Sequence, residues 1–198
     1  MRREDWDRKY GDTERLWSDE PYRHFLAEIE GLSPGRALDL ACGEGRHAIA
    51  LAELGWRVTA VDFSEVAIAR ARKRAAAAGL EVDFECIDLL GFEPDPGASQ
   101  LVLVIFLQLP ADERRLVLSR AATALAPGGT LLLVGHDLLN RTEGVGGPSD
   151  PAVLYSPDDI VSELPGLEIE KAERVLRDVA DAERPAIDAL VRARRPES

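Results

Sequence analysis

The stretch ALDLACGEGRHA, residues 37–48, decides the fold of this chain. A short apolar run over residues 36–41 leads into a turn that carries Gly43 and Gly45, and residues 46–54 then follow a helical pattern that ends at Gly55. Glycines between a strand and a helix let a ligand approach the backbone closely. The stretch therefore predicts the first strand–turn–helix unit of a nucleotide-binding sheet.

Strand and helix patterns alternate along the rest of the chain. We expect strands over residues 57–61, 81–86, 101–107 and 130–135, and helices over residues 65–78 and 111–125. The run at 101–107 is apolar at every position, which is typical of a strand buried on both faces of a parallel sheet. A short helix near 158–163 precedes two closing strands, about 167–177 and 186–194, which we expect to be antiparallel. The pattern predicts an α/β, doubly wound Rossmann-like fold with a mostly parallel sheet.

Two segments lie outside this alternation. Residues 3–30 carry the spacing of one or two amphipathic helices, and residues 136–156 are rich in Gly and Pro without a regular period. A structureless loop of that length is unusual in a compact domain and often functional, for example as a lid. We therefore expect residues 136–156 to close over a substrate.

Composition limits the function. The 198 residues suffice for one domain, and 36 acidic against 24 basic residues give a net charge of −12. Such a surface repels phosphate backbones, so we expect no nucleic-acid partner and no anionic membrane partner. The longest apolar run is far shorter than the ~20 residues of a membrane helix, and the charged first residues lead us to expect no secretory signal. Two cysteines without metal-ligand spacing predict no disulfide framework and no metal, and we expect a cytoplasmic location.

An acidic residue marks the expected ribose site. Asp62 ends the second strand, 19 positions after Gly43, where a carboxylate in a doubly wound sheet can accept hydrogen bonds from ribose hydroxyls. The spacing Gly43-x-Gly45-x-x-Ala48 formally satisfies the dinucleotide fingerprint, but that motif alone is weak. The pattern therefore predicts a nucleoside ligand without deciding which one.

Two further carboxylates disfavour a pyrophosphate. Glu44 lies between the two glycines, where a pyrophosphate requires N–H groups, and Asp39 precedes the same turn. Such a pocket suits a ligand with a positive end and no phosphate. S-adenosyl-L-methionine, a nucleoside with an ammonium and a sulfonium, fits this description. A nicotinamide cofactor is the alternative.

At this point the chain resembles the class I S-adenosylmethionine-dependent methyltransferases over roughly residues 1–195. LDLACGEGR resembles their first motif, VTAVDFS the acidic second motif, CIDLL the third, and LAPGGTLLLVG the turn into the fifth strand. Within that superfamily the chain is similar to the small single-domain tellurite-resistance and thiopurine methyltransferase-like group. The resemblance implies seven strands with an antiparallel last strand. It also implies a single methyltransferase domain over residues 1–198, with an N-terminal helical cap segment (1–30), a cofactor-binding core (31–135), and the long loop with the C-terminal strands (136–198).

The resemblance also implies cofactor-binding roles at matching positions. The methionine moiety would contact Asp39, Gly43 and Gly45, with Arg46 near its carboxylate. The ribose would bind Asp62 and the adenine would pack on Phe63. The remaining cofactor contacts would come from Asp88 and Leu89, at the adenine amino group, and from Phe106, near the sulfonium. Core packing or helix capping is the alternative role for Asp88 and Phe106.

Residues for the methyl acceptor are expected after the fourth and fifth strands. Gln108 follows the fourth strand, and His136 follows the fifth, where its imidazole could deprotonate a thiol or hydroxyl while Asp137 orients it. WDRKY resembles the segment that covers the cleft in this family, so Trp6, Tyr10 and Trp17 are candidates for the substrate side. These rings could instead hold an N-terminal helix to the core.

The sequence thus predicts methyl transfer to a small-molecule acceptor, namely a thiol, a chalcogen oxyanion or a hydroxyl. Two alternatives from other classes stay open at this stage, an NAD(P)-binding oxidoreductase and a non-catalytic nucleoside-binding or scaffold protein. The oligomeric state is not decided by the sequence.

Overall fold

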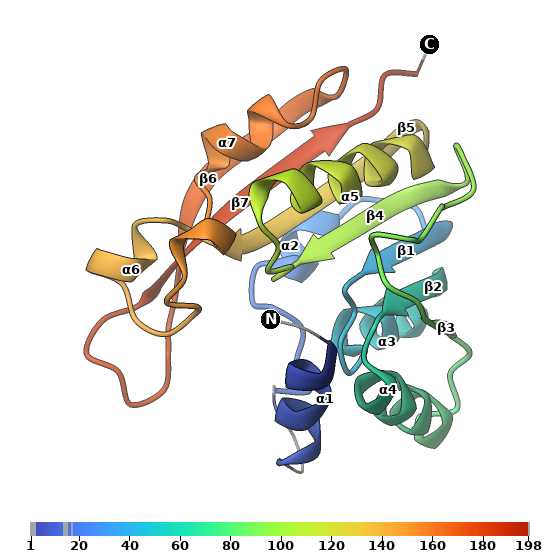
Figure 1. The fold of residues 1–198 in the computed structure, drawn as a ribbon. Helices are drawn as coiled ribbons and strands as arrows, with labels where there is room; N and C mark the ends of the chain where they lie inside the picture. The colour runs from blue at the N-terminus through green and yellow to red at the C-terminus, as the bar shows by residue number, and fades with distance from the viewer. Residues whose placement is uncertain (1–2, 14–15, 17, 198) are drawn as a thin grey trace. The chain divides into compact units, whose positions relative to one another are not determined.

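A computed structural model describes residues 3–13, 16 and 18–197, so the predicted role of Trp17 lies outside the described residues. The chain forms two compact units, Met1–Phe92 and Glu93–Ser198, each with its own strands and helices (Figure 1). Each unit is described by itself.

The first unit contains three parallel strands in the order β3-β2-β1. The strands are β1 (Arg36–Leu40), β2 (Arg57–Asp62) and β3 (Asp83–Cys86). The helices are α1 (Arg3–Gly11), α2 (Phe25–Ile29), α3 (Arg46–Glu53) and α4 (Glu65–Ala77), and α1 packs beside α4 (Figure 1). The carboxyl ends of β1 and β2 lie level, with Leu40 opposite Val61, so the residues that follow these two strands share one edge.

Local chemistry explains where α4 begins and ends. The hydroxyl of Ser64 accepts the backbone N–H of Ala67 and caps the first turn. Gly79 follows the last turn with a φ of +68°, a left-handed conformation that glycine adopts without steric cost. Both signals stand in the sequence, and the predicted helix over residues 65–78 is confirmed.

The second unit contains four strands in the order β4-β5-β7-β6. They are β4 (Ser99–Ile105), β5 (Leu125–His136), β6 (Glu168–Arg177) and β7 (Ala186–Arg194). β4 and β5 pair in parallel, whereas β7 is antiparallel to both β5 and β6. The helices are α5 (Ala111–Ala124), α6 (Asn140–Glu143) and α7 (Pro157–Ser162), with a single 3₁₀ turn, η1 (Pro151–Val153) (Figure 1).

The described residues therefore contain seven strands, mostly parallel, with an antiparallel last strand, and the predicted α/β fold class is confirmed. β4 is buried at every position except Gln100, as its uninterrupted apolar run predicts. α7 begins with a reciprocal capping box between Ser156 and Asp159, which explains why a helix forms there.

The expectation of one structureless loop over residues 136–156 was wrong. The segment contains α6 and η1, and the buried side chain of Asn140 organises it. The amide nitrogen of Asn140 donates to the carbonyls of Val145 and Gly146, and its oxygen accepts the backbone N–H of Ile187 at 2.7 Å. A single side chain thus satisfies backbone groups that a loop would otherwise leave to water.

Two element boundaries also differ from the prediction. β5 begins at Leu125 and runs through Pro127, Gly128 and Gly129, which we expected to form the turn before a strand over residues 130–135. The pairing of β4 with β5 is irregular between Ser99 and Leu101, so the strand accommodates these turn residues. Within the described residues, no helix is long and apolar enough to cross a membrane.

Candidate functional site

The turn between β1 and α3 has an unusual backbone. Ala41, Gly43 and Gly45 all have positive φ values, of 63°, 54° and 78°. A Cβ on Gly45 would lie 2.9 Å from a ring carbon of Phe84, so a larger residue does not fit there. Left-handed backbone is strained at a non-glycine residue such as Ala41, and such strained residues occur mostly at functional sites. The turn is therefore shaped for a ligand rather than for the shortest connection.

Asp62, at the end of β2, stabilises this turn. One carboxylate oxygen accepts the backbone N–H of Gly43 at 2.9 Å, and the other accepts that of Ser64 at 2.9 Å. Burial raises the pKa of Asp62, although these two hydrogen bonds oppose the shift. A carboxylate offers about four lone-pair positions, so acceptor capacity is left for ligand hydroxyls.

Asp39, near the end of β1, is a buried carboxylate with an unsatisfied oxygen. The side chain is 1% exposed, and its Oδ2 atom has no hydrogen-bond partner among the described residues. Burial first, and then the negative charge of Asp62, raise the pKa of Asp39 to about 7. Orphaned buried acceptors are rare because each carries a desolvation penalty of roughly 1–3 kcal/mol. The Oδ2 atom of Asp39 is therefore available to accept a hydrogen bond from a cationic ligand.

Glu44, inside the turn, has its own counter-ion. Arg70 on α4 donates to the carboxylate of Glu44 at 3.0 Å, and Arg74 donates to the Glu44 carbonyl at 2.9 Å. These two arginines of α4 therefore contact the turn and do not only form a solvated face of the helix. Because Arg70 compensates the charge of Glu44, that charge no longer argues against a pyrophosphate.

The N-terminal helix α1 covers the turn. A Cβ on Gly43 would lie 2.9 Å from the hydroxyl oxygen of Tyr10, which is itself buried. Trp6 stacks near Tyr10, with ring centroids 5.9 Å apart, and Asp7 accepts the Ser64 hydroxyl at 2.5 Å. Of the predicted substrate-side rings, the structure thus places Tyr10 directly over the glycine turn.

The other predicted cofactor residues of this unit lie at or after the carboxyl ends of the strands. Arg46 begins α3 and lies close enough to Asp39 to lower its pKa in part. Phe63 is partly buried after β2, and Leu89 is buried after β3. Asp88 is exposed and accepts the backbone N–H of Leu90 at 2.9 Å, so it also closes a local turn. None of these placements decides a ligand contact, and their roles stay predictions.

In the second unit, four side chains form a cluster at the ends of β4, β5 and β6 and near the start of β7. We call Phe106, His136, Arg177 and Asp188 the histidine cluster. The rings of Phe106 and His136 lie 4.9 Å apart, and the guanidinium of Arg177 lies 5.4 Å from the Phe106 centroid. Phe106 has a φ of 60°, a second strained position at a strand end.

Asp188 anchors the histidine cluster from β7. It lies opposite His136 in the strand register, and its Oδ1 is 3.4 Å from Nδ1 of His136. Arg177 donates to both carboxylate oxygens, at 2.8 and 3.3 Å. Asp188 is fully buried, so its charge is held by these two neighbours.

The predicted orienting role of Asp137 is therefore corrected. Its carboxylate pairs with Arg174 at 2.9 Å and accepts the backbone N–H of Leu139 at 2.8 Å. Asp137 lies just after β5, which ends at His136, and its carboxylate is engaged by Arg174 and the following turn rather than by the imidazole. Gln108, which we expected near the acceptor, is partly buried just after β4.

Sequence reasoning missed Asp188 and Arg177. A usable signal was present, because Asp188 is a single charge inside the apolar run AIDALV, and a charge in such a run requires a partner. The identity of that partner depends on strand register, which no local pattern shows.

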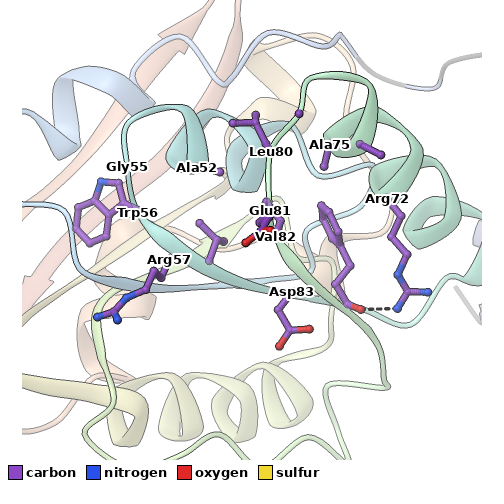
Figure 2. Close-up of a pocket in the computed structure, with 14 residues that line it drawn as sticks. Ala52, Gly55, Trp56, Arg57, Arg72, Ala75, Leu80, Glu81, Val82 and Asp83 are labelled. Carbon is purple, nitrogen blue, oxygen red and sulfur yellow. Dashed lines mark hydrogen bonds between the residues drawn. The ribbon is translucent and has the colours of Figure 1, made fainter.

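A separate groove opens at the opposite end of the strands of the first unit. It encloses about 710 Å³ and is lined at the starts of β2 and β3 by Arg57, Val58, Asp83 and Phe84 (Figure 2). Arg72 donates across it to the carbonyl of Phe84. Ligands of open α/β sheets bind at the carboxyl ends of the strands, so this groove is not the nucleoside site. Among the described residues, no group of three His, Cys, Asp or Glu side chains could hold a metal ion.

Comparison with known proteins finds methyltransferase relatives for part of the chain. Residues 37–129 match the family described as "Methyltransferase domain". The ubiquinone biosynthesis O-methyltransferase of Idiomarina loihiensis is 30% identical over 139 residues, which cover 69% of this chain and 56% of that protein. The chain therefore spans little more than half the length of this relative.

Solved structures share the fold. A structure reported for the conversion of a disulfide bond into a thioacetal group during echinomycin biosynthesis has a TM-score of 0.74 and 26% identity, and covers 92% of this chain and 86% of its own. TehB of Haemophilus influenzae has a TM-score of 0.74 at 18% identity, covering 98% of this chain and 68% of its own. The likeness to TehB shows the fold alone, so the tellurite-resistance grouping stays a prediction. The domain match and the relatives together show that residues 37–129 of this chain are similar to the methyltransferase domain family.

Proposed function

We propose that this protein transfers a methyl group from S-adenosyl-L-methionine to a small-molecule acceptor. The observation that carries the proposal is the buried, unsatisfied Oδ2 atom of Asp39 beside a turn with left-handed backbone. The methionine end of this cosubstrate carries an ammonium, which is the kind of donor that Asp39 lacks. When bound, the cosubstrate supplies a methyl group activated on a sulfonium.

The residues of the first unit bind and orient. Asp39 accepts from the ammonium, Gly43 and Gly45 allow the methionine moiety to approach the backbone, and Arg46 pairs with its carboxylate. The ribose hydroxyls donate to Asp62. Phe63, Asp88 and Leu89 contact the adenine. Holding the reacting groups in line is the main task of the protein in a displacement of this kind.

The acceptor side rests on the histidine cluster and the N-terminal rings. His136 removes a proton from a thiol or hydroxyl, and Phe106 faces the sulfonium through its ring. Trp6 and Tyr10 exclude water from the bound methionine, and Gln108 contacts the acceptor. The Idiomarina relative is named for O-methylation, which supports a hydroxyl acceptor.

We also propose that the acceptor is not a nucleic acid or a membrane lipid and that the protein works in the cytoplasm. A net charge of −12 opposes approach to polyanions and supports this part of the proposal. A small acceptor that is not a polyanion is not repelled in this way.

Calorimetric titration with S-adenosylhomocysteine tests the donor site. Replacing Asp39 by Asn keeps the shape and removes the charge, so affinity should fall about tenfold or more, as expected for loss of a charge-assisted hydrogen bond. Asp83→Asn is the matched control, because Asp83 is exposed at the start of β3. Its affinity should equal that of the unmodified protein.

A thermal-shift comparison separates the alternatives. Ligand at ~100 times its dissociation constant adds about 2.7 kcal/mol, or roughly 5–10 °C for a chain of this size. S-adenosylmethionine and S-adenosylhomocysteine should both raise the melting temperature, and NADH and NADPH should not. A shift with NADH or NADPH alone would overturn the proposal in favour of an oxidoreductase. Binding without methyl transfer to any acceptor would favour a non-catalytic nucleoside-binding protein.

A further inference from the structure

The histidine cluster supports an inference that rests on the proposed function and extends it. We propose that Asp188 is the positioning residue of His136, holding the imidazole so that its Nε2 atom accepts a proton from a hydroxyl or thiol acceptor. The cluster would then select acceptors whose nucleophilic atom must lose a proton.

The strand register places the pair. His136 and Asp188 are directly opposite on antiparallel β5 and β7, so their side chains lie on the same face of the sheet. Nδ1 of His136 is buried without a hydrogen-bond partner among the described residues, and Oδ1 of Asp188 lies 3.4 Å from it. Sites without substrate often show such long contacts, which tighten in the reactive complex.

Arg177 keeps the carboxylate charged. Its two hydrogen bonds, at 2.8 and 3.3 Å, reach both oxygens of Asp188 from β6. Burial raises the pKa of Asp188, but its interactions with His136 and Arg177 outweigh burial and hold that pKa below its ordinary value. A charged Asp188 accepts the Nδ1–H of His136 and thereby fixes the tautomer whose lone pair is on Nε2.

The other carboxylate near the imidazole does not compete for it. Asp137 is engaged by Arg174 and by the backbone N–H of Leu139. Among the described residues, Asp188 on β7 lies against His136 and Arg177 on β6 pairs with Asp188. The hydroxyl of Tyr155 also interacts with Asp188 electrostatically. Phe106 contributes an uncharged ring, and Gly147 also lies against the imidazole.

The reaction balances with these groups. The bond between the methyl carbon and the sulfonium sulfur breaks, and the sulfur keeps the electron pair. A bond forms between that carbon and the acceptor oxygen or sulfur, whose proton passes to Nε2 of His136. The imidazolium, stabilised by Asp188, then returns the proton to solvent water.

The first experiment determines the tautomer of His136 and does not require methyl transfer. Nitrogen NMR of the protein with bound S-adenosylhomocysteine distinguishes Nδ1–H from Nε2–H, and a His136→Gln variant assigns the signals among the three histidines. We expect Nδ1–H at His136 in the unmodified protein and in the control Asp137→Asn, and loss of that preference in Asp188→Asn. Asp137→Asn removes a neighbouring buried carboxylate without touching the pair.

The second experiment reads methyl transfer with two probe acceptors. Catechol must lose a proton, whereas thiophenol is already largely ionised at neutral pH. Asp188→Asn and His136→Gln should each lower kcat for catechol roughly a hundredfold with KM nearly unchanged, and lower it far less for thiophenol. In Asp188→Asn the acidic limb of the kcat profile should move to lower pH, because the imidazolium loses its counter-ion.

The outcomes separate this inference from the proposed function. An unchanged tautomer in Asp188→Asn, or equal kcat losses in Asp188→Asn and Asp137→Asn, would overturn the role of Asp188. Failure of S-adenosylhomocysteine to bind would overturn the proposed function instead, and the tautomer of the ligand-free protein would still test the pair. If Asp188→Asn and Asp137→Asn both lowered the melting temperature, that loss would be a general effect on folding. The tautomer of His136 should still change in Asp188→Asn alone.

Discussion

The backbone N–H of Gly43 donates to the carboxylate of Asp62 across 2.9 Å, joining the first glycine of the turn after β1 to the last residue of β2. The second oxygen of the same carboxylate accepts the N–H of Ser64, where α4 is about to begin. Asp62 thus holds the shape of the ligand turn before any ribose is bound. Its predicted binding role and its structural role rest on the same carboxylate.

Replacing Asp62 by Ala should therefore lower both stability and ligand affinity. Two buried N–H groups lose their acceptor, which should reduce the free energy of unfolding by roughly 2 kcal/mol. The dissociation constant of S-adenosylhomocysteine should rise about tenfold or more. Urea denaturation and calorimetry measure the two effects. A variant that unfolds at the unmodified urea midpoint would contradict the structural role, whatever its affinity.

A second prediction concerns the buried ion pair of Arg114 on α5 with Glu163, just after α7. Two hydrogen bonds of 2.9 and 2.7 Å join side chains that are only 5% and 6% exposed. Glu163→Ala leaves a buried guanidinium unpaired, which should reduce the free energy of unfolding by about 3–5 kcal/mol. The double variant Arg114→Met with Glu163→Leu should recover most of this loss, because it leaves no buried charge.

Chemical denaturation of the single and double variants checks the ion pair. Asp112→Ala is a suitable control, since its bridge to Arg115 is exposed and such pairs contribute about 0–1 kcal/mol. A double variant as unstable as Glu163→Ala would show that packing, rather than the unpaired charge, causes the loss.

Local signals made much of the fold predictable. The glycine spacing of the turn, the Ser64 cap and the apolar run of β4 each act within a few residues of the chain. Their structural consequence therefore does not depend on what packs against them. For the same reason the carboxylates Asp39 and Asp62 could be assigned to one edge of the sheet, since Asp62 ends a parallel strand and Asp39 is the next-to-last residue of its neighbour.

Pairing across the sheet could not be predicted in the same way. The partner of His136 depends on the register of β7 against β5, and a shift of one residue would have presented a different side chain. The contacts of Arg70 and Arg74 with Glu44 depend on how α4 packs against the turn. Spacing in the sequence shows that these arginines lie on one helix, but it does not show which groups their side chains contact.

The pH dependence of the free energy of unfolding should reveal the raised pKa of Asp39. Its pKa of about 7 in the folded protein lies above the ordinary value of 3.8, so the folded state binds more protons between these values than the unfolded state. Stability contributed by this group is therefore present at low pH and is lost as pH rises toward 7, with a slope of up to about 1.4 kcal/mol per pH unit. Asp39→Asn should remove this slope and be more stable than the unmodified protein near pH 8.

Denaturation curves at several pH values, with Asp83→Asn as the control, test this expectation. Binding should show the converse linkage, because a cationic ligand favours the ionised carboxylate. Calorimetry of S-adenosylhomocysteine near pH 6 in buffers of different ionisation enthalpy should detect proton release by the unmodified protein and less by Asp39→Asn. Equal pH slopes in Asp39→Asn and the unmodified protein would contradict the raised pKa.

The last prediction concerns Gly135, where a Cβ would collide with the hydroxyl and ring of Tyr155. Tyr155 cannot move aside, because its ring is buried beneath the guanidinium of Arg114, 4.8 Å from its centroid, and its backbone N–H donates to the carbonyl of His136. Gly135→Ala should therefore lower the free energy of unfolding by roughly 2–3 kcal/mol, and adding Tyr155→Leu should restore part of it. Gly11→Ala, which meets nothing within 4 Å, is the matched control and should change stability by less than about 1 kcal/mol. If Gly135→Ala were as stable as this control, the contact between β5 and Tyr155 would not constrain the strand that carries His136.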